Sequence, residues 1–322
     1  MWLDVVRLVV GLIALSFAAD RLVRSAVTIS RAFEVSAVII GAVIIGFGTS
    51  IPEFVVSGLA AVEGELDLAI ANVVSSNIAN VTLVLGTAAV ISALPTARHV
   101  TRREGVLMLA ALLILVAVLA DGQLGFWEGV MLLALLGGAI LLMVRWAADD
   151  PSDVASALDG VATIEDEGAV SQSVWRSRVG REIVIGILAV LVTVAAAKFL
   201  LDGAIGLGEH FGLSIVFLGL ITGVGTSLPE LAAAVASARR KQSALAVGNV
   251  LGSNIFNSLG VIGFAAVLGP GSFAGITKLF LAVMIGVALV AGVSAFTGRR
   301  IERLEGALLL ILFLGYAILA FG

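Results

Sequence analysis

The chain has 322 residues, of which 60% are hydrophobic and only 13% are charged, whereas about a quarter of an ordinary soluble domain is charged. Together with a mean hydropathy of +1.15, this composition excludes a soluble globular protein, a disordered chain and a nucleic-acid-binding protein. The sequence has no cysteine, which also excludes disulfides, thiolate metal sites and thiol redox chemistry. The net charge of −4 says little about partners, because charge in a membrane protein lies mainly in the loops.

Ten apolar stretches of about 20 residues predict an all-α polytopic membrane protein with ten transmembrane helices. These stretches lie near residues 3–24, 35–62, 67–94, 104–120, 125–147, 182–202, 213–238, 243–268, 276–296 and 303–321. The first stretch also has features of a signal peptide, with Arg7 before an apolar run and small residues at Ala18 and Ala19. Its end has a counterpart in the sixth stretch, so we assign it to a repeated unit instead.

Basic residues are distributed unequally between the two sides of the predicted membrane. When the connections are assigned to the two sides in alternation, 16 of the 19 Lys and Arg residues fall on one side, and the other side has only Arg7, Lys198 and Lys278. Because cytoplasmic loops are enriched in Lys and Arg, we expect both termini to be extracellular and the connection 148–181 to be cytoplasmic. Seven acidic residues predict that this connection is a solvated linker rather than a cation sensor, since it lacks the ligand spacing of an EF-hand.

The chain contains an internal repeat. Residues 46–86 align without gaps on residues 223–263, at a constant offset of 177, with 17 identities in 41 positions that include Pro, Glu and Asn. Each half has five predicted helices, an odd number, so the second half must enter the membrane from the opposite face. The sequence therefore predicts two inverted five-helix repeats, 1–147 and 182–322, joined by the linker 148–181. Inverted repeats of this kind place a substrate site near the midplane, where the halves meet.

Two glutamates, Glu53 and Glu230, lie inside apolar stretches, each in the motif Gly-x-Gly-Thr-Ser-x-Pro-Glu. An unpaired charge there costs about 3 kcal/mol or more, and no Lys or Arg occurs between residues 36 and 94 or between residues 243 and 276. Pro52 and Pro229 lack the N–H that would bond to a carbonyl one turn back, so they predict broken helices at the midplane. Free carbonyls and Thr and Ser hydroxyls are therefore expected around each carboxylate.

Carbonyl, hydroxyl, amide and carboxylate oxygens suit hard cations such as Ca²⁺, Na⁺ or Mg²⁺ rather than soft transition metals. In the adjoining helices, Ser76 and Asn80 in the first half, and Ser253 and Asn257 in the second, are four residues apart and can face the same site. Two carboxylates balance the charge of one divalent cation, which favours Ca²⁺ as a principal substrate. Other repeated residues are typical of helix packing: Asn72, Asn249, Gly86 and Gly263.

These residues resemble the repeat motifs of the calcium/cation antiporter superfamily, and in particular those of prokaryotic sodium/calcium exchangers. The first half has Gly-Phe-Gly-Thr-Ser-Ile-Pro-Glu at 46–53 and an Asn- and Ser-rich segment at 72–80, and the second half has corresponding segments at 223–230 and 248–257. The resemblance implies antiport of Ca²⁺ and Na⁺ by alternating access. It also implies that the first and sixth helices slide across the remaining bundle.

The same resemblance implies a set of cation ligands. The glutamates and threonine carbonyls would bind Ca²⁺, the serines, glycine carbonyls and same glutamates would form Na⁺ positions, and the asparagines would complete the central position. These residues are Glu53, Glu230, Thr49, Thr226, Ser50, Ser227, Ser76, Ser253, Asn80, Asn257, Gly46 and Gly223. The chain departs from the family pattern in having amides at both 80 and 257, where many exchangers have at least one Asp. Three bound Na⁺ ions would then leave one positive charge that the two carboxylates do not balance. The amides also make K⁺ co-transport an unexpected activity for this chain.

The leading expectation is Na⁺-driven Ca²⁺ antiport across the plasma membrane by a chain that works as a monomer, without a cofactor, enzymatic activity or nucleic-acid partner. Protons could replace Na⁺ as the counter-ion, since burial favours neutralisation of a carboxyl pair, so H⁺/Ca²⁺ antiport is the alternative. A cation channel is less expected, because channels usually gain their pore from oligomeric symmetry. An intramembrane enzyme would need a nucleophile or a histidine set, which the glutamate motifs lack.

Overall fold

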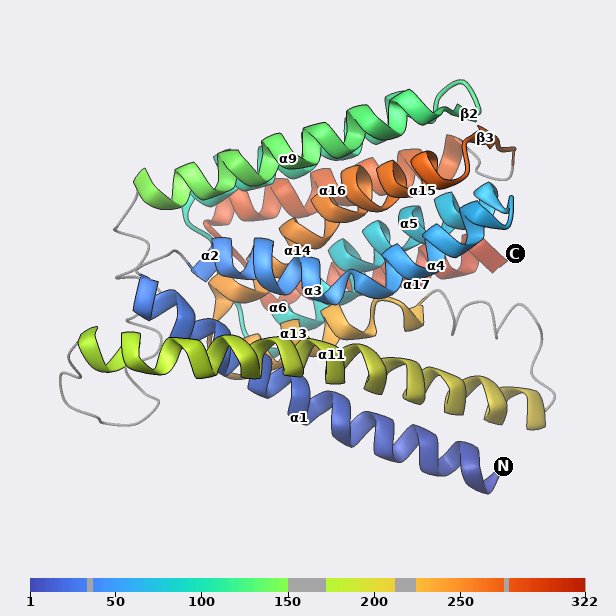
Figure 1. The fold of residues 1–322 in the computed structure, drawn as a ribbon. Coiled ribbons are helices and arrows are strands. Elements are labelled where there is room, and N and C mark those ends of the chain that lie inside the picture. The colour runs from blue at the N-terminus through green and yellow to red at the C-terminus, as the bar shows by residue number, and fades with distance from the viewer. Residues whose placement is uncertain (34–36, 150–171, 212–223, 275–277, 322) are drawn as a thin grey trace.

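The structure is a computed structural model that describes residues 1–33, 37–149, 172–211, 224–274 and 278–321. The chain forms a bundle of helices with two short β-bridges, and both termini lie at the same end of the bundle (Figure 1). Seven helices among the described residues are long and apolar enough to cross a membrane, and an eighth crossing follows if the bent pair Ile40–Thr49 and Ile51–Val62 is one span.

The helical segments of the first half follow the order of the predicted spans. They are α1 (Trp2–Phe33); α2 (Ala37–Ile39) with the π-helical η1 (Ile40–Ile45), α3 (Gly46–Thr49) and α4 (Ile51–Val62); α5 (Leu66–Ala79) with π-helical η2 (Asn80–Val84) and α6 (Leu85–Ile91); α7 (Arg98–Val100) with π-helical η3 (Thr101–Gly105) and α8 (Val106–Val118); and α9 (Phe126–Asp149). Strand β1 (Leu94–Pro95) precedes α7, and strand β2 (Gln123–Leu124) precedes α9.

The second half repeats this order within the described residues. Its elements are α11 (Gln172–His210), α13 (Leu228–Arg239), α14 (Ser243–Ile255) with π-helical η4 (Phe256–Val261) and α15 (Ile262–Leu268), β3 (Gly271–Ser272), α16 (Lys278–Gly298), β4 (Arg300–Ile301) and α17 (Arg303–Phe321). The start of the predicted seventh span and most of the predicted linker lie outside the described residues.

The two β-bridges reproduce the offset of the repeat. Strand β1 pairs antiparallel with β4, and β2 pairs antiparallel with β3. Adding 177 to the residue numbers of β1 gives β3, and adding 177 to those of β2 gives β4. The repeat therefore relates the β1–β4 bridge to the β2–β3 bridge. Glycine contacts follow the same rule, since a Cβ added at Gly86 would meet the Gly306 carbonyl at 2.9 Å and one at Gly129 would meet the Gly263 carbonyl at 2.7 Å. Close helix packing at Gly86 and Gly263 agrees with the sequence interpretation.

Four turn residues with left-handed backbone are also related by the repeat. Gly64 (φ 83°) and Gly122 (φ 76°) in the first half correspond to Lys241 (φ 56°) and Arg299 (φ 53°) in the second. Left-handed geometry costs a residue with a Cβ roughly 1–2 kcal/mol, so the second half keeps these turns with residue types that disfavour them. Because the repeat is inverted, corresponding turns lie at opposite ends of the bundle.

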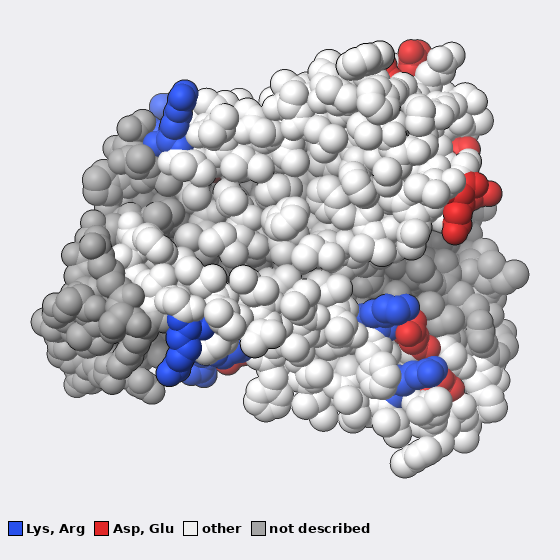
Figure 2. All heavy atoms as spheres, in the orientation of Figure 1, with Lys and Arg blue, Asp and Glu red and all other residues white. Residues whose placement is uncertain are grey.

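The helices with the repeated asparagines are the most buried of the apolar spans. These are α5–η2–α6 and α14–η4–α15, whereas α9 and α17 expose most of their apolar side chains. Figure 2 shows the consequence on one face, where a broad surface without charged residues separates an end rich in Asp and Glu from an end with Lys and Arg. A mixed group of both charges lies toward the end with the termini. An apolar surface of this extent is typical of a protein embedded in lipid.

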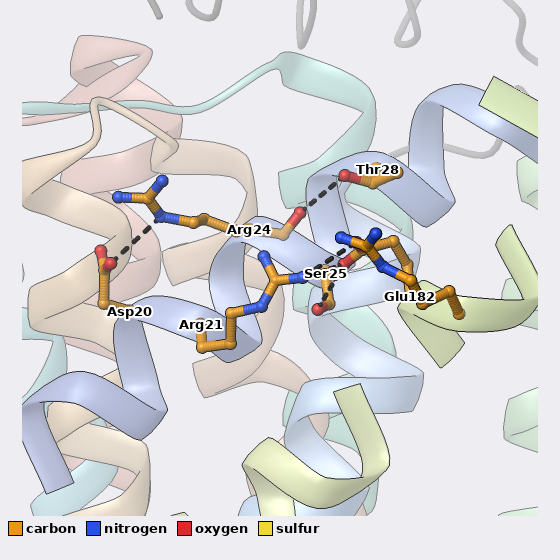
Figure 3. Close-up of polar contacts among 7 residues, drawn as sticks. Asp20, Arg21, Arg24, Ser25, Thr28 and Glu182 are labelled. Atoms are coloured by element: carbon orange, nitrogen blue, oxygen red, sulfur yellow. Dashed lines mark hydrogen bonds and ion pairs between the residues drawn. The ribbon is translucent and has the colours of Figure 1, made fainter. Parts of the chain in front are cut away.

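Helices α1 and α11 pack against each other along one side of the bundle (Figure 1). Glu182 of α11 is 6% exposed and accepts hydrogen bonds from the Arg21 guanidinium at 2.6 and 2.9 Å and from the Ser25 hydroxyl at 3.0 Å (Figure 3). The neighbouring Asp20 pairs with Arg240, which follows α13, at 2.5 Å. Adjacent residues of α1 therefore fix this helix to α11 and to the rest of the bundle.

Replacing Glu182 with Ala leaves the Arg21 guanidinium without its carboxylate partner. We expect the free energy of unfolding to fall by about 1.5–3 kcal/mol, the range for hydrogen bonds to charged groups, as measured by thermal unfolding in detergent micelles. Glu302→Ala is the matched control, because Glu302 pairs with Arg300 at an exposed position, where ion pairs contribute about 1 kcal/mol or less. Equal losses of stability in the two variants would contradict the role given to Glu182.

Candidate cation site at the helix breaks

The broken helices occur at corresponding serines of the two halves. Ser50 lies between α3 and α4 with φ −80° and ψ 2°, and the helix axis bends there by 46°. Ser227 precedes α13 with nearly the same geometry, φ −89° and ψ 7°. Pro52 and Pro229 follow in the first turns of α4 and α13, where a missing N–H is tolerated. Each proline therefore begins a new helix rather than interrupting a continuous one.

Glu53 and Glu230 occupy the first turns of these new helices and are fully buried. The N-terminus of a helix has a partial positive charge that stabilises a carboxylate. The Ser50 hydroxyl donates to Oε1 of Glu230 at 3.3 Å, across the boundary between the halves, so the serine at the helix break of one half contacts the carboxylate of the other. In the described part of the chain, neither carboxylate has a Lys or Arg partner.

Hydroxyl and amide groups around the carboxylates form two networks that cross between the halves. Thr49 Oγ1 donates to Asn249 Oδ1 at 3.3 Å and lies 3.5 Å from Ser253 Oγ. The second network has the corresponding contacts, at 3.3 and 3.4 Å, and consists of Thr226 Oγ1, Asn72 Oδ1 and Ser76 Oγ. Each network joins a threonine of one half to an asparagine and a serine of the other half. The contact between the halves is therefore polar where the helices break.

Eight buried polar atoms of the predicted ligand residues have no hydrogen-bond partner among the described residues. They are both carboxylate oxygens of Glu53, Oε2 of Glu230, Oγ of Ser227, and both amide atoms of Asn80 and Asn257. Buried polar atoms in proteins are nearly always satisfied, and an unsatisfied one costs about 1–3 kcal/mol. A bound cation would supply the missing interactions for the oxygen atoms, so these atoms indicate a ligand.

The structure brings the predicted ligand residues to one region of the bundle. The ten predicted ligand residues other than the two glycines are all 7% exposed or less. Asn80 and Asn257 lie in π-helical segments, with η2 packed against α13 and η4 against α4, the helices that begin next to the glutamates. The Gly46 carbonyl accepts from the Ser50 N–H at 3.1 Å and from the Ser253 hydroxyl at 3.4 Å. The twelfth predicted ligand, the Gly223 carbonyl, lies outside the described residues.

The structure relates Asn72 and Asn249 more closely to the site than the sequence interpretation did. Asn249 Nδ2 donates to the backbone carbonyl of Glu230 at 3.3 Å, and Asn72 Nδ2 donates to Ser57 of α4 at 3.1 Å. Each amide oxygen accepts from a threonine of the opposite half. These two asparagines therefore position the glutamate-bearing helices as well as packing them. The sequence indicated a role for these asparagines only by repeating them in both halves. That repetition does not distinguish a residue that packs helices from one that positions the glutamates.

The chemistry of this region is that of a site for hard cations. No group of three or more His, Cys, Asp and Glu side chains lies together within the described ranges. The polar groups around the two carboxylates are hydroxyls and amides, whose neutral oxygens Na⁺ and Ca²⁺ accept as ligands. Helix breaks at the contact between two inverted halves are characteristic of secondary transporters. The fold and this region together define a membrane transporter of cations.

Comparisons with known proteins agree with this class. The profile described as sodium/calcium exchanger protein matches residues 3–145 and 182–322. The chain is 36% identical over 321 residues to CaxA of Alkalimonas amylolytica, covering 97% of each chain. It is 29% identical over 346 residues to the sodium/calcium exchanger MaX1 of Methanosarcina acetivorans, covering 98% of this chain and 97% of that one. The sodium-calcium exchanger NCX_Mj, soaked with zero Na⁺ and Ca²⁺, superposes with a TM-score of 0.81 at 27% identity over 98% of each chain.

The chain belongs to the sodium/calcium exchanger family. It is therefore a multi-pass membrane antiporter for Ca²⁺ and other cations, not an enzyme.

Proposed function

We propose that the chain exchanges Ca²⁺ for Na⁺ at a site formed by Glu53, Glu230 and the surrounding Thr, Ser and Asn oxygens. The observation that carries this proposal is the buried pair of glutamates, one from each inverted half, with unpaired oxygen atoms beside it. Two carboxylates are neutralised by one Ca²⁺ or by two Na⁺ ions. The two cations can therefore compete for the same oxygens, which antiport requires.

Charge balance also bears on the coupling ratio. Asn80 and Asn257 are fully buried amides, so they add oxygen ligands without adding charge. A site with two Na⁺ ions is neutral, whereas a third Na⁺ would leave one uncompensated positive charge in a buried place, which is unfavourable. The proposal therefore favours two Na⁺ per Ca²⁺, with the carbonyls of Gly46 and Gly223 as further Na⁺ ligands.

Exchange of Ca²⁺ for H⁺ is the second candidate. The unpaired carboxylate oxygens of Glu53 and Glu230 favour it, because protons neutralise an empty pair of buried carboxylates as well as Na⁺ does. The sites for the two counter-ions would be the same oxygens. Measurements of ion flux separate the two candidates.

Transport of ⁴⁵Ca²⁺ into proteoliposomes loaded with Na⁺ tests the coupling. With the pH clamped on both sides, we expect Ca²⁺ uptake to follow the Na⁺ gradient and to stop when choline replaces internal Na⁺. Uptake that ignores Na⁺ and disappears when the pH gradient is collapsed would support H⁺ coupling instead. Single-channel currents in a planar bilayer would contradict antiport altogether.

We further propose that residues 1–147 and 182–322 are the two repeats of a monomeric plasma-membrane transporter. The paired glutamates come from one chain, which supports a monomer. The charged ends of the bundle (Figure 2) support extracellular termini and a cytoplasmic linker 148–181, by the preference of Lys and Arg for the cytoplasm. Since the chain has no cysteine, a single cysteine in place of Leu3 should react with an impermeant thiol reagent on intact cells if the terminus is extracellular, and should not react if it is cytoplasmic.

A further inference from the structure

An apolar pocket of about 320 Å³ lies between α8, α14 and α16, near the bridge of β1 with β4. Its walls include Val250 and Leu251 of α14 and Ala291, Gly292 and Phe296 of α16. The pocket opens to the surface of the bundle, since Phe296 is 52% exposed. A cavity of this size is at the lower end of the range for small-ligand sites.

The internal repeat places larger side chains at the positions that correspond to two residues of this pocket. Thr96 and Gly292 line the pocket, and the residues that correspond to them by the offset of 177 are Phe273 and Leu115. Phe273 packs against the hydrophobic core and Leu115 is fully buried. Large side chains therefore fill the corresponding position of the other half. A Cβ added at Gly292 would meet no atom within 4 Å. A larger side chain at this position of α16 would therefore fit without a clash.

Polar and basic groups gather at one rim of the pocket. The Arg102 guanidinium lies 6.0 Å from the centre of the Phe296 ring, and Arg102 is exposed. The adjacent Thr101 also lines the pocket, and its hydroxyl is buried without a hydrogen-bond partner among the described residues. Arg299, beside the same bridge, is exposed as well, whereas Arg300 pairs with Glu302. The pocket thus combines apolar walls with a basic rim.

We propose that this pocket binds one acyl chain of an anionic phospholipid, with the headgroup phosphate at Arg102. Apolar walls at the lipid-facing surface exclude water-soluble ligands and favour a hydrocarbon chain. The charge of the rim selects among lipids, because each Lys or Arg near a membrane surface contributes about 1 kcal/mol of attraction to anionic headgroups. The inference is independent of the coupling ion.

The test compares phosphatidylglycerol with phosphatidylcholine in nanodiscs, followed by native mass spectrometry of the released protein. We expect wild-type protein to retain one phosphatidylglycerol molecule at least fivefold more than phosphatidylcholine. Gly292→Leu introduces the leucine that the other half has at this place and should reduce the retained lipid at least fivefold. Arg102→Gln should abolish the preference for phosphatidylglycerol while phosphatidylcholine retention stays the same.

Gly286→Leu is the matched control for the pocket variant. Gly286 lies on the same helix, also has no atom within 4 Å of an added Cβ, and does not line the pocket. This variant should retain phosphatidylglycerol as the wild type does. Thermal unfolding in detergent identifies misfolded variants, and Thr96→Phe provides a second way to fill the pocket with its counterpart residue. Equal retention of both lipids by the wild type, or unchanged phosphatidylglycerol retention in both filled variants, would overturn the proposal.

Discussion

Glu53→Gln should reduce Ca²⁺ transport to less than about a tenth of the wild-type rate, which corresponds to a transport barrier raised by more than ~1.4 kcal/mol. The substitution keeps the size of the side chain and removes half of the negative charge that balances a buried divalent cation. Because the repeat supplies an equivalent carboxylate, Glu230→Gln should have a similar effect. The measurement is the initial rate of ⁴⁵Ca²⁺ uptake into proteoliposomes with equal amounts of protein.

Glu63→Gln is the control for both variants, because Glu63 is an exposed residue at the C-terminal end of α4. It removes one carboxylate from the same helix without changing the buried pair, so its uptake rate should stay near that of the wild type. Retention of more than about a tenth of the wild-type rate in Glu53→Gln would show that this carboxylate does not balance the transported ion.

Asn257→Asp is expected to increase the apparent affinity for Na⁺ about tenfold, equivalent to ~1.4 kcal/mol. Both amide atoms of Asn257 are buried and unpaired, and a third carboxylate beside Glu53 and Glu230 would balance a third monovalent cation. Competition of Na⁺ with Ca²⁺ for purified protein, followed by isothermal titration, measures the change. The corresponding variant Asn80→Asp should act in the same direction.

A comparison of these two variants also tests the symmetry of the site. If Na⁺ affinity increases in one variant and not in the other, only one of the two asparagines is a ligand. If Na⁺ affinity is unchanged in both, neither position contacts the ion, and the proposed site contracts to the glutamates with their Thr and Ser neighbours. Thermal unfolding of each variant in detergent serves as the reference for correct folding.

The order of the helices and the inverted repeat could be predicted from the sequence, because both depend on local patterns. Apolar length defines a span, and the break at Ser50 follows from Pro52 and the glycines before it. The burial of Glu53 and Glu230 could be predicted from their position inside apolar stretches, and the lack of a basic partner from the absence of Lys and Arg nearby. The predicted fold class is confirmed by the helical structure and by the match to NCX_Mj over 98% of both chains.

The contacts between segments distant in sequence could not be predicted. The bond from Ser50 to Glu230 joins residues 180 positions apart, and the pair of Arg21 with Glu182 joins residues 161 positions apart. Such contacts depend on which faces two packed helices turn toward each other, and a single sequence does not define this orientation. The π-helical turns at Asn80 and Asn257 were missed for a similar reason, since one extra residue in a turn leaves no compositional sign.

The left-handed turns of the second half link backbone geometry to the insertion of the chain into its membrane. Lys241 and Arg299 occupy positions where their counterparts Gly64 and Gly122 would be relaxed. Because the halves are inverted, these two turns lie at the end of the bundle opposite to Gly64 and Gly122. If that end is cytoplasmic, as proposed above, a cation at each turn favours its retention there. The strain of the left-handed backbone would then accompany a charge that favours the proposed topology.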